Sequence, residues 1–137
     1  LVRLENLVKL DLSENQGVTD EGMDSVAQLT NLRELNLWTT PVSDDGVSKL
    51  TSLTNLTWLN LDKTRITDQA ISDSVSQMEQ LTWLHLGSNN LTDESIAGLL
   101  KLGQLKYLNV SYTKISQDGF FQLDDAMAER GGIVIPP

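Results

Sequence analysis

The stretch LTWLHL, residues 81–86, has leucine at its first, fourth and sixth positions. The same spacing of apolar residues occurs in four other segments, at 7–12, 32–37, 56–61 and 105–110. Successive segments begin 24 or 25 residues apart. A fixed period of this length indicates a repeat architecture, in which similar short units stack on one another.

Each unit is expected to contain a strand followed by a helix. The alternation of apolar and polar residues around the leucines predicts a short strand with one buried face. Further along stands a signature of Thr or Ser, Asp and a small residue, as in the SDDG of residues 43–46. A hydroxyl cap and carboxylates suited to the helix dipole predict a helix start there, and the small residue is expected where that start is crowded by its neighbour. Apolar residues then recur at helical spacing, for example Val47, Leu50 and Leu53.

One unit alone buries too little apolar surface to offset the entropy lost in ordering its backbone, so the units must share a core. We therefore predict an α/β fold: a curved, right-handed leucine-rich solenoid with a parallel β-sheet on its concave face and helices on its convex face. A single domain would span residues 1–137, with a partial repeat at 1–6 and a cap at about 124–137 that includes a last short strand at 133–135. About five repeats would open at Leu7, Leu32, Leu56, Leu81 and Leu105.

The period and the L-x-x-L-x-L pattern resemble the leucine-rich repeat family. The Thr/Ser-Asp-x-small signature is similar to that of its F-box-type and bacterial members. The F-box-type subclass has cysteine at the ninth position of the unit, where this chain has Asn15, Thr40, Thr64, Asn89 and Thr113. A bacterial variant is therefore the better match, and these Asn and Thr side chains are expected to bond the backbone where the chain leaves each strand.

Composition narrows the possible partners and location. The net charge of −9 argues against nucleic acid, whose binding depends on phosphate neutralisation by Lys and Arg. The chain has no apolar run long enough to span a membrane. It also has no cysteine, whereas extracellular members of the family usually carry disulfide-bonded caps, so a cytoplasmic location is favoured. The leucines of the first unit lack a neighbour, so further repeats, a cap or a partner chain are expected at the N-terminal edge.

All three tryptophans and both tyrosines occupy strand or strand-exit positions that point away from the core. Because adjacent strands lie about 4.8 Å apart, Trp58, Trp83 and Tyr107 are expected to form a neighbouring row, with Trp38 and Tyr112 on the rim. The polar residues expected around this row are Glu34, Asn36, Asn60, Asp62, His85 and Asn109.

These residues favour a non-catalytic module that binds a protein or peptide on its concave face, since Trp and Tyr dominate binding hot spots. Two alternatives are carbohydrate binding along the aromatic row and a purely structural segment of a larger scaffold. A Ser111-His85-Asp62 relay can be drawn on the sheet, but it lacks an oxyanion hole and a pocket, so an enzyme is not expected. With one histidine and no cysteine, neither a metal site nor a cofactor is expected.

Overall fold

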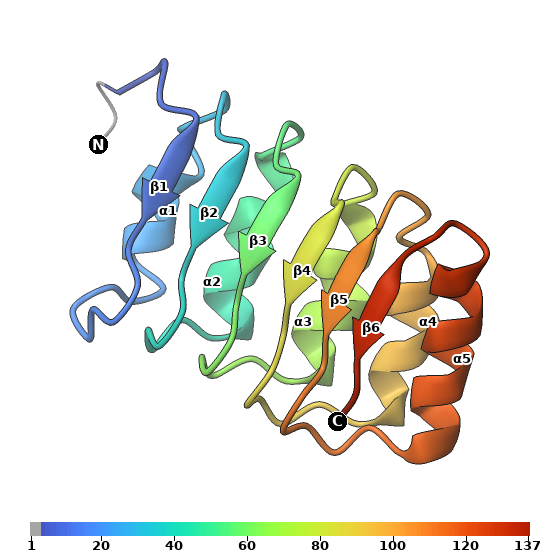
Figure 1. Cartoon of the computed structure of the whole chain (residues 1–137). Helices are drawn as coiled ribbons and strands as arrows, with labels where there is room; N and C mark the ends of the chain where they lie inside the picture. The colour runs from blue at the N-terminus through green and yellow to red at the C-terminus, as the bar shows by residue number, and fades with distance from the viewer. Residues whose placement is uncertain (1–3) are drawn as a thin grey trace.

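The computed structural model describes residues 4–137, which form one open sheet of six parallel strands with helices packed against one face (Figure 1). The strands are β1 (Lys9–Asp11), β2 (Glu34–Asn36), β3 (Trp58–Asn60), β4 (Trp83–His85), β5 (Tyr107–Asn109) and β6 (Ile133–Ile135). They lie in the sheet in the same order as in the chain. This architecture confirms the predicted solenoid, including the last short strand at 133–135.

The α-helices of the first four units have only five or six residues, because each unit must complete a strand, a crossover and a return within about 24 residues. The α-helices are α1 (Gly22–Val26), α2 (Asp44–Ser48), α3 (Asp68–Asp73), α4 (Ile96–Leu100) and α5 (Gln117–Ala128). Three 3₁₀-helices adjoin them: η1 (Lys49–Ser52), η2 (Val75–Gln77) and η3 (Asp93–Ser95). Each helix crosses behind the sheet and returns the chain to the next parallel strand.

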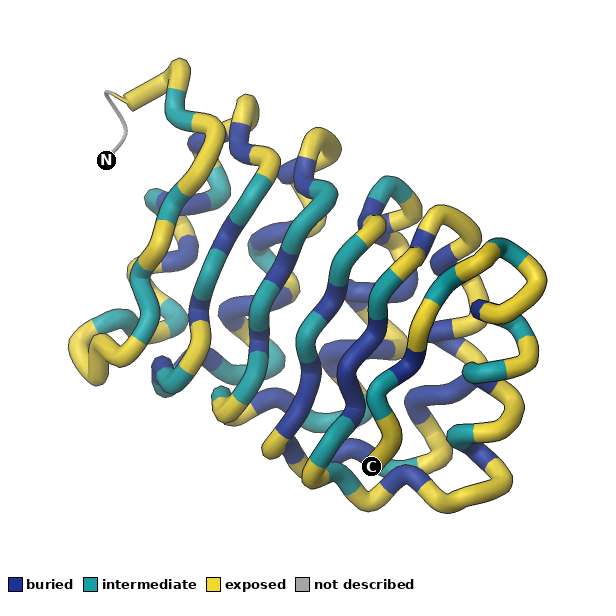
Figure 2. The backbone as a smooth tube through the Cα atoms, in the orientation of Figure 1, coloured by how far each residue is buried: buried dark blue, intermediate teal, exposed yellow. Residues whose placement is uncertain are grey.

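A single core runs between the sheet and the helices. The central residue of each inner strand is fully buried and lies opposite its equivalent in the next unit, as with Leu59 between Leu35 and Leu84. The residues on either side of it are mostly half-buried, so buried and accessible segments alternate along the strands (Figure 2). The helical apolar residues close the core from behind, as Val47 and Leu50 do in the second unit.

Every strand ends in the same turn. The eighth residue of each unit has a left-handed backbone, with φ between 55° and 58°, although none of the five is glycine. An Asn at the fifth position supports this turn in β2, β3 and β5, because its amide oxygen accepts the backbone N–H two residues later. Asn60 accepts from the Asp62 N–H at 2.9 Å, for example. These Asn side chains therefore shape the backbone first and leave only their amide N–H groups for other contacts.

The ninth position also bonds the backbone, as expected. The hydroxyls of Thr40, Thr64 and Thr113 donate to the carbonyl oxygen three residues earlier, at 2.7 to 2.9 Å. Asn89 reaches further, because its amide donates to the carbonyls of both Leu61 and Leu86 and so links two units.

The aspartates at the helix starts have a role that the dipole explanation missed. Asp44 accepts from the backbone N–H of Thr67 at 2.7 Å and from its hydroxyl at 2.6 Å, so it holds the helix start of the following unit. The same pair of hydrogen bonds joins Asp20 to Ser43, Asp68 to Thr92 and Asp93 to Ser116. We call this repeated contact the aspartate clamp. The dipole explanation was incomplete for this set: Asp44, Asp68 and Asp93 do lie in the first turn of a helix, but their oxygens are also bonded to the next unit.

The clamp explains the small residue at the helix start. A Cβ added to Gly46 would lie 2.4 Å from Asp20 Oδ1, and one added to Gly119 would lie 2.6 Å from Asp93 Oδ1. In the fourth unit Ser95 stands at this position, and its hydroxyl donates to Asp68 Oδ1 at 2.5 Å. The expected crowding is confirmed, and the crowding atom is the clamp carboxylate.

Two neighbouring acids give a direct test of the clamp. Asp44→Ala is expected to lower the free energy of unfolding by about 2–3 kcal/mol, because two charge-assisted hydrogen bonds are lost. Asp45→Ala, one residue further into the same helical turn, is exposed and should cost only about 0.5 kcal/mol through the dipole. Equal losses of unfolding free energy in urea would show that the clamp adds nothing to the effect of the helix dipole.

Two glycines at equivalent positions should respond in opposite ways. Gly22 has no atom within 4 Å of an added Cβ, whereas Gly46 has the Asp20 carboxylate there. Gly22→Ala is expected to be neutral or to stabilise the protein by up to about 1 kcal/mol through helix propensity. Gly46→Ala should destabilise it by about 1–3 kcal/mol through overpacking. Thermal unfolding of both variants measures the difference, and a shift of the same sign in both would refute the crowding argument.

Candidate functional site

The aromatic row predicted on the exposed face of the sheet is present, and its rings are stacked. The ring centroids of Trp58 and Trp83 lie 4.3 Å apart with an interplanar angle of 10°. Those of Trp83 and Tyr107 lie 4.9 Å apart at 5°. The three residues are register partners on β3, β4 and β5, so the strand spacing itself brings the rings to stacking distance. We call these three residues the aromatic stack.

Stacking decides which parts of the rings are accessible. Both faces of Trp83 are covered, one by Trp58 and the other by Tyr107. The side chains are half-buried, so the stack presents mainly ring edges to the solvent. Only the two end rings have a face that no other ring covers: Trp58 on its β2 side and Tyr107 on its β6 side.

His85 extends the aromatic cluster along β4 and approaches a carboxylate. Its ring lies 5.4 Å from that of Trp83 at 14°. Its Nδ1 atom lies 3.2 Å from Asp62 Oδ2, but the two groups are not aligned for a hydrogen bond. Among the described residues, His85 Nδ1 and Asp62 Oδ1 are buried polar atoms with no hydrogen-bond partner. Burial lowers the pKa of His85, an effect that the nearby Asp62 charge partly offsets, and burial raises the pKa of Asp62.

The other predicted site residues are distributed around the stack. Trp38 and Tyr112 lie on the rim, with 37% and 85% of their surface exposed, and neither joins the stack. Glu34 lies beside the stack on β2 and pairs with Lys9 at 3.5 Å. Asn36 and Asn60 are half-buried.

Asn109 was expected to face the solvent, as the other residues at the fifth position of the units were, but it is buried. It is only 8% exposed, since it lies between register partners on β4 and β6 and its amide oxygen accepts from the Ser111 N–H and hydroxyl. The Ser111 hydroxyl donates to Asn109 at 2.6 Å. It is therefore committed to the turn rather than to a relay with His85.

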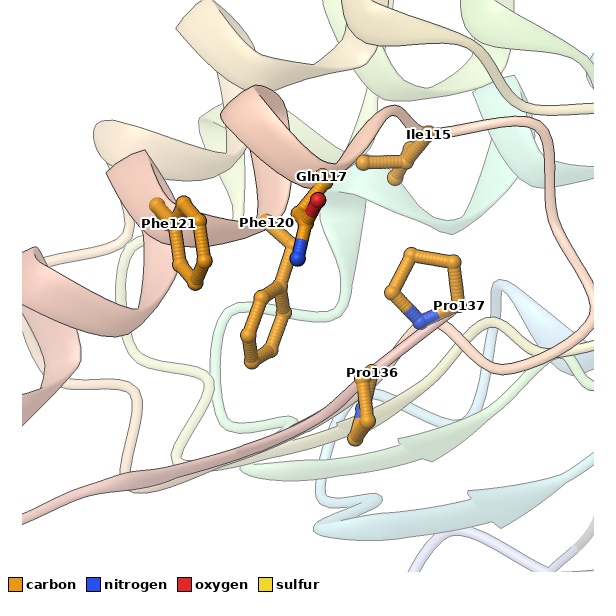
Figure 3. A pocket seen from close by; sticks show the side chains of 6 residues that line it. All are labelled: Ile115, Gln117, Phe120, Phe121, Pro136 and Pro137. Atoms are coloured by element: carbon orange, nitrogen blue, oxygen red, sulfur yellow. The ribbon is translucent and has the colours of Figure 1, made fainter.

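Two hollows lie near the ends of the sheet. One has a volume of about 300 Å³ and adjoins Trp58; we call it the Trp58 hollow. It is lined by Lys9, Leu10, Asp11, Glu34, Asn36 and Trp58. Sequence reasoning did not select Lys9 or Asp11, although both occupy the same unit positions as Glu34 and Asn36. The other hollow has a volume of about 320 Å³ and lies between α5 and the C-terminal tail; its lining is mainly apolar (Figure 3).

No group of three or more His, Cys, Asp or Glu side chains in residues 4–137 is arranged to hold a metal ion. Among the same residues, no helix has the length and apolar character that crossing a membrane requires.

The geometry defines a class: a solenoid of stacked strand–helix units with an accessible sheet face. The family model described as "Leucine rich repeat" matches residues 30–91 and 54–115, and a second leucine-rich repeat model matches residues 3–27. The chain therefore belongs to the leucine-rich repeat family. No curated protein matches it in sequence.

Solved structures with a similar fold include bacterial leucine-rich repeat proteins. Internalin C2 from Listeria monocytogenes is 27% identical, with a TM-score of 0.68 over 98% of this chain and 54% of its own. A leucine-rich repeat protein from Leptospira interrogans is 22% identical, with a TM-score of 0.67 over 97% of this chain and 38% of its own. Actin-binding site 2 of leiomodin-1 is 16% identical, with a TM-score of 0.70 over 93% of this chain and 83% of its own. The chain thus spans about half of internalin C2 and less of the Leptospira protein.

The buried environment of His85 gives a measurable pH effect. Because the folded-state pKa of His85 lies below its ordinary value of 6.5, its contribution to the free energy of unfolding is fully present above that pH and is lost as the pH falls through the folded-state pKa.

Asp62→Asn removes the charge that raises the His85 pKa, so it should lower that pKa further. NMR titration of the single imidazole measures this shift. Asp11→Asn is the control, and a His85 pKa that rises in Asp62→Asn would contradict the coupling.

Proposed function

We propose that this chain is a non-catalytic module that binds a protein or peptide on the exposed, concave face of its sheet. Leucine-rich repeat proteins commonly mediate protein–protein interaction. The observation that carries the proposal is the aromatic stack with its rim residues, because it gathers all the Trp and Tyr side chains of the chain on or beside one accessible face.

The stack suits a protein surface because it is rigid before binding. Each ring is held by its neighbour, so a partner that packs on the ring edges orders few additional rotamers. Trp and Tyr combine large apolar area with a polar group and are enriched in binding hot spots. The proposed contact residues are the stack, the rim residues Trp38 and Tyr112, and the polar groups of Glu34, Asn36, Asn60, Asp62 and His85.

Carbohydrate binding is the weaker alternative on geometric grounds. A sugar ring packs its C–H groups against the flat face of an aromatic ring, and both faces of Trp83 are already covered. A structural role of the stack does not exclude a binding role. Stacked aromatic pairs also stabilise a sheet, by about 0.5–1.5 kcal/mol each. The stack can therefore stiffen the sheet and present a binding edge at the same time.

Action by binding rather than catalysis is supported by the Ser111 geometry. The only histidine of the chain lies beside Asp62, but the nearby Ser111 hydroxyl donates to Asn109. A serine nucleophile activated by His85 would instead have to donate its hydroxyl hydrogen bond to the His85 ring.

Site-specific photo-crosslinking tests which face of the solenoid binds the partner. A photoreactive residue at Tyr112, on the rim, is expected to capture a partner in cells of the source organism, whereas one at Glu94, exposed at the start of a helix, is not. The captured protein is then purified and its affinity is measured. The Trp58→Leu/Trp83→Leu variant should bind it at least 30-fold more weakly, equivalent to about 2 kcal/mol of hot-spot energy.

The same variant needs a stability control, because it also removes the stacking contacts. It should lose about 1–3 kcal/mol of unfolding free energy and remain folded at the assay temperature. Phe121→Ala, at an exposed aromatic on α5, is the matched control and should leave the affinity unchanged. Unchanged affinity in the folded double variant would overturn the proposed face.

A further inference from the structure

The two ends of the aromatic stack differ in chemistry. On the β6 side, Tyr107 has Ile133 as its register partner, so that end is aliphatic. On the β2 side, the register partner of Trp58 is Glu34, and the next one on β1 is Lys9. Because one face of Trp58 is covered by Trp83, its other face is directed across the sheet toward this charged end.

The Trp58 hollow lies at that charged end. It is lined by residues of β1, β2 and β3 and has a volume of about 300 Å³. Two of its lining residues are carboxylates, Asp11 and Glu34, and one is a cation, Lys9. The Ser13 hydroxyl and N–H donate to Asp11 Oδ1 at 2.6 and 2.9 Å, and these bonds lower the pKa of Asp11.

The cation at the hollow is weakly held. Lys9 Nζ lies 3.5 Å from Glu34 Oε2, and the two side chains are 73% and 40% exposed. An exposed pair of this kind contributes little to stability and exchanges readily with solvent. A partner cation can therefore displace Lys9 from Glu34, which leaves the hollow with two carboxylates and an indole face.

We propose that the Trp58 hollow receives an arginine side chain of the protein partner, with its guanidinium stacked on the open face of Trp58 and its N–H groups donated to Asp11 and Glu34. This inference rests on the proposed function and specifies the chemistry of the partner at one end of the stack. A planar guanidinium can lie flat on an indole while the N–H groups in its own plane reach carboxylates, whereas a lysine ammonium is a compact point charge that cannot stack. The hollow between α5 and the tail has no charged residue in its lining and provides no such site.

A small probe tests the site without the partner. N-acetyl-arginine amide is titrated into the protein, and the indole N–H signals of the three tryptophans are followed by NMR. The Trp58 signal, assigned with Trp58→Phe, is expected to shift and to saturate. N-acetyl-citrulline amide has nearly the same shape without the charge and should bind at least about threefold more weakly. Equal binding of the two probes would overturn the proposal.

Charge variants sharpen the test because their expected effects on arginine binding have opposite signs. Glu34→Gln and Asp11→Asn should each weaken arginine binding about threefold or more, whereas Lys9→Gln should strengthen it by removing the competing cation. All three are surface changes that leave the core intact. Asp45→Asn, an exposed acid on α2, is the matched control and should have no effect. Unchanged or weaker arginine binding in Lys9→Gln would also overturn the proposal.

The two proposals fail in distinguishable ways. If the double tryptophan variant loses the crosslinked partner but the arginine probe does not bind, the proposal that the concave face binds the partner is supported and the proposed arginine site is refuted. If the probe binds at Trp58 but the double variant keeps its partner, the hollow is a cation site and the partner uses another surface.

Discussion

The in-register pairing of equivalent strand residues is the constraint on which the rest of the structure depends. It places each buried leucine opposite the leucine of the next unit, and this builds a continuous core behind the sheet. On the other face, the same pairing sets the spacing of Trp58, Trp83 and Tyr107. Strand spacing and aromatic stacking distance are nearly equal, so a core requirement also orders the exposed surface.

The aspartate clamp joins neighbouring units a second time, at their helix starts. Strand pairing aligns consecutive units along the sheet, and the clamp aligns their helix starts, since each carboxylate bonds both the backbone and the hydroxyl of the following Ser or Thr. Neighbouring units that carry the clamp are therefore joined by two separate sets of contacts, one along the sheet and one at the helix starts.

The sequence was sufficient to predict the solenoid and the aromatic row because both follow from periodicity. It was insufficient for the clamp, because Asp44 has a local explanation at its own helix start while its partner, Thr67, lies 23 residues away. Periodicity also reports which face a residue occupies but not its accessibility. Asn109 thus appeared to be a free polar group, although a neighbouring strand and its own turn cover it. The closed faces of Trp83 were missed for the same reason, because ring orientation depends on contacts across strands.

The clamp also bears on how such a chain can change in length. An inner unit carries both halves of the contact, a hydroxyl residue that faces the preceding unit and a carboxylate that faces the following one, as Thr67 and Asp68 do. A tandem duplication of one such unit in the gene would therefore create a new junction that is already complementary. At the clamp positions, recombination between repeats would therefore need no compensating substitution to lengthen or shorten this array.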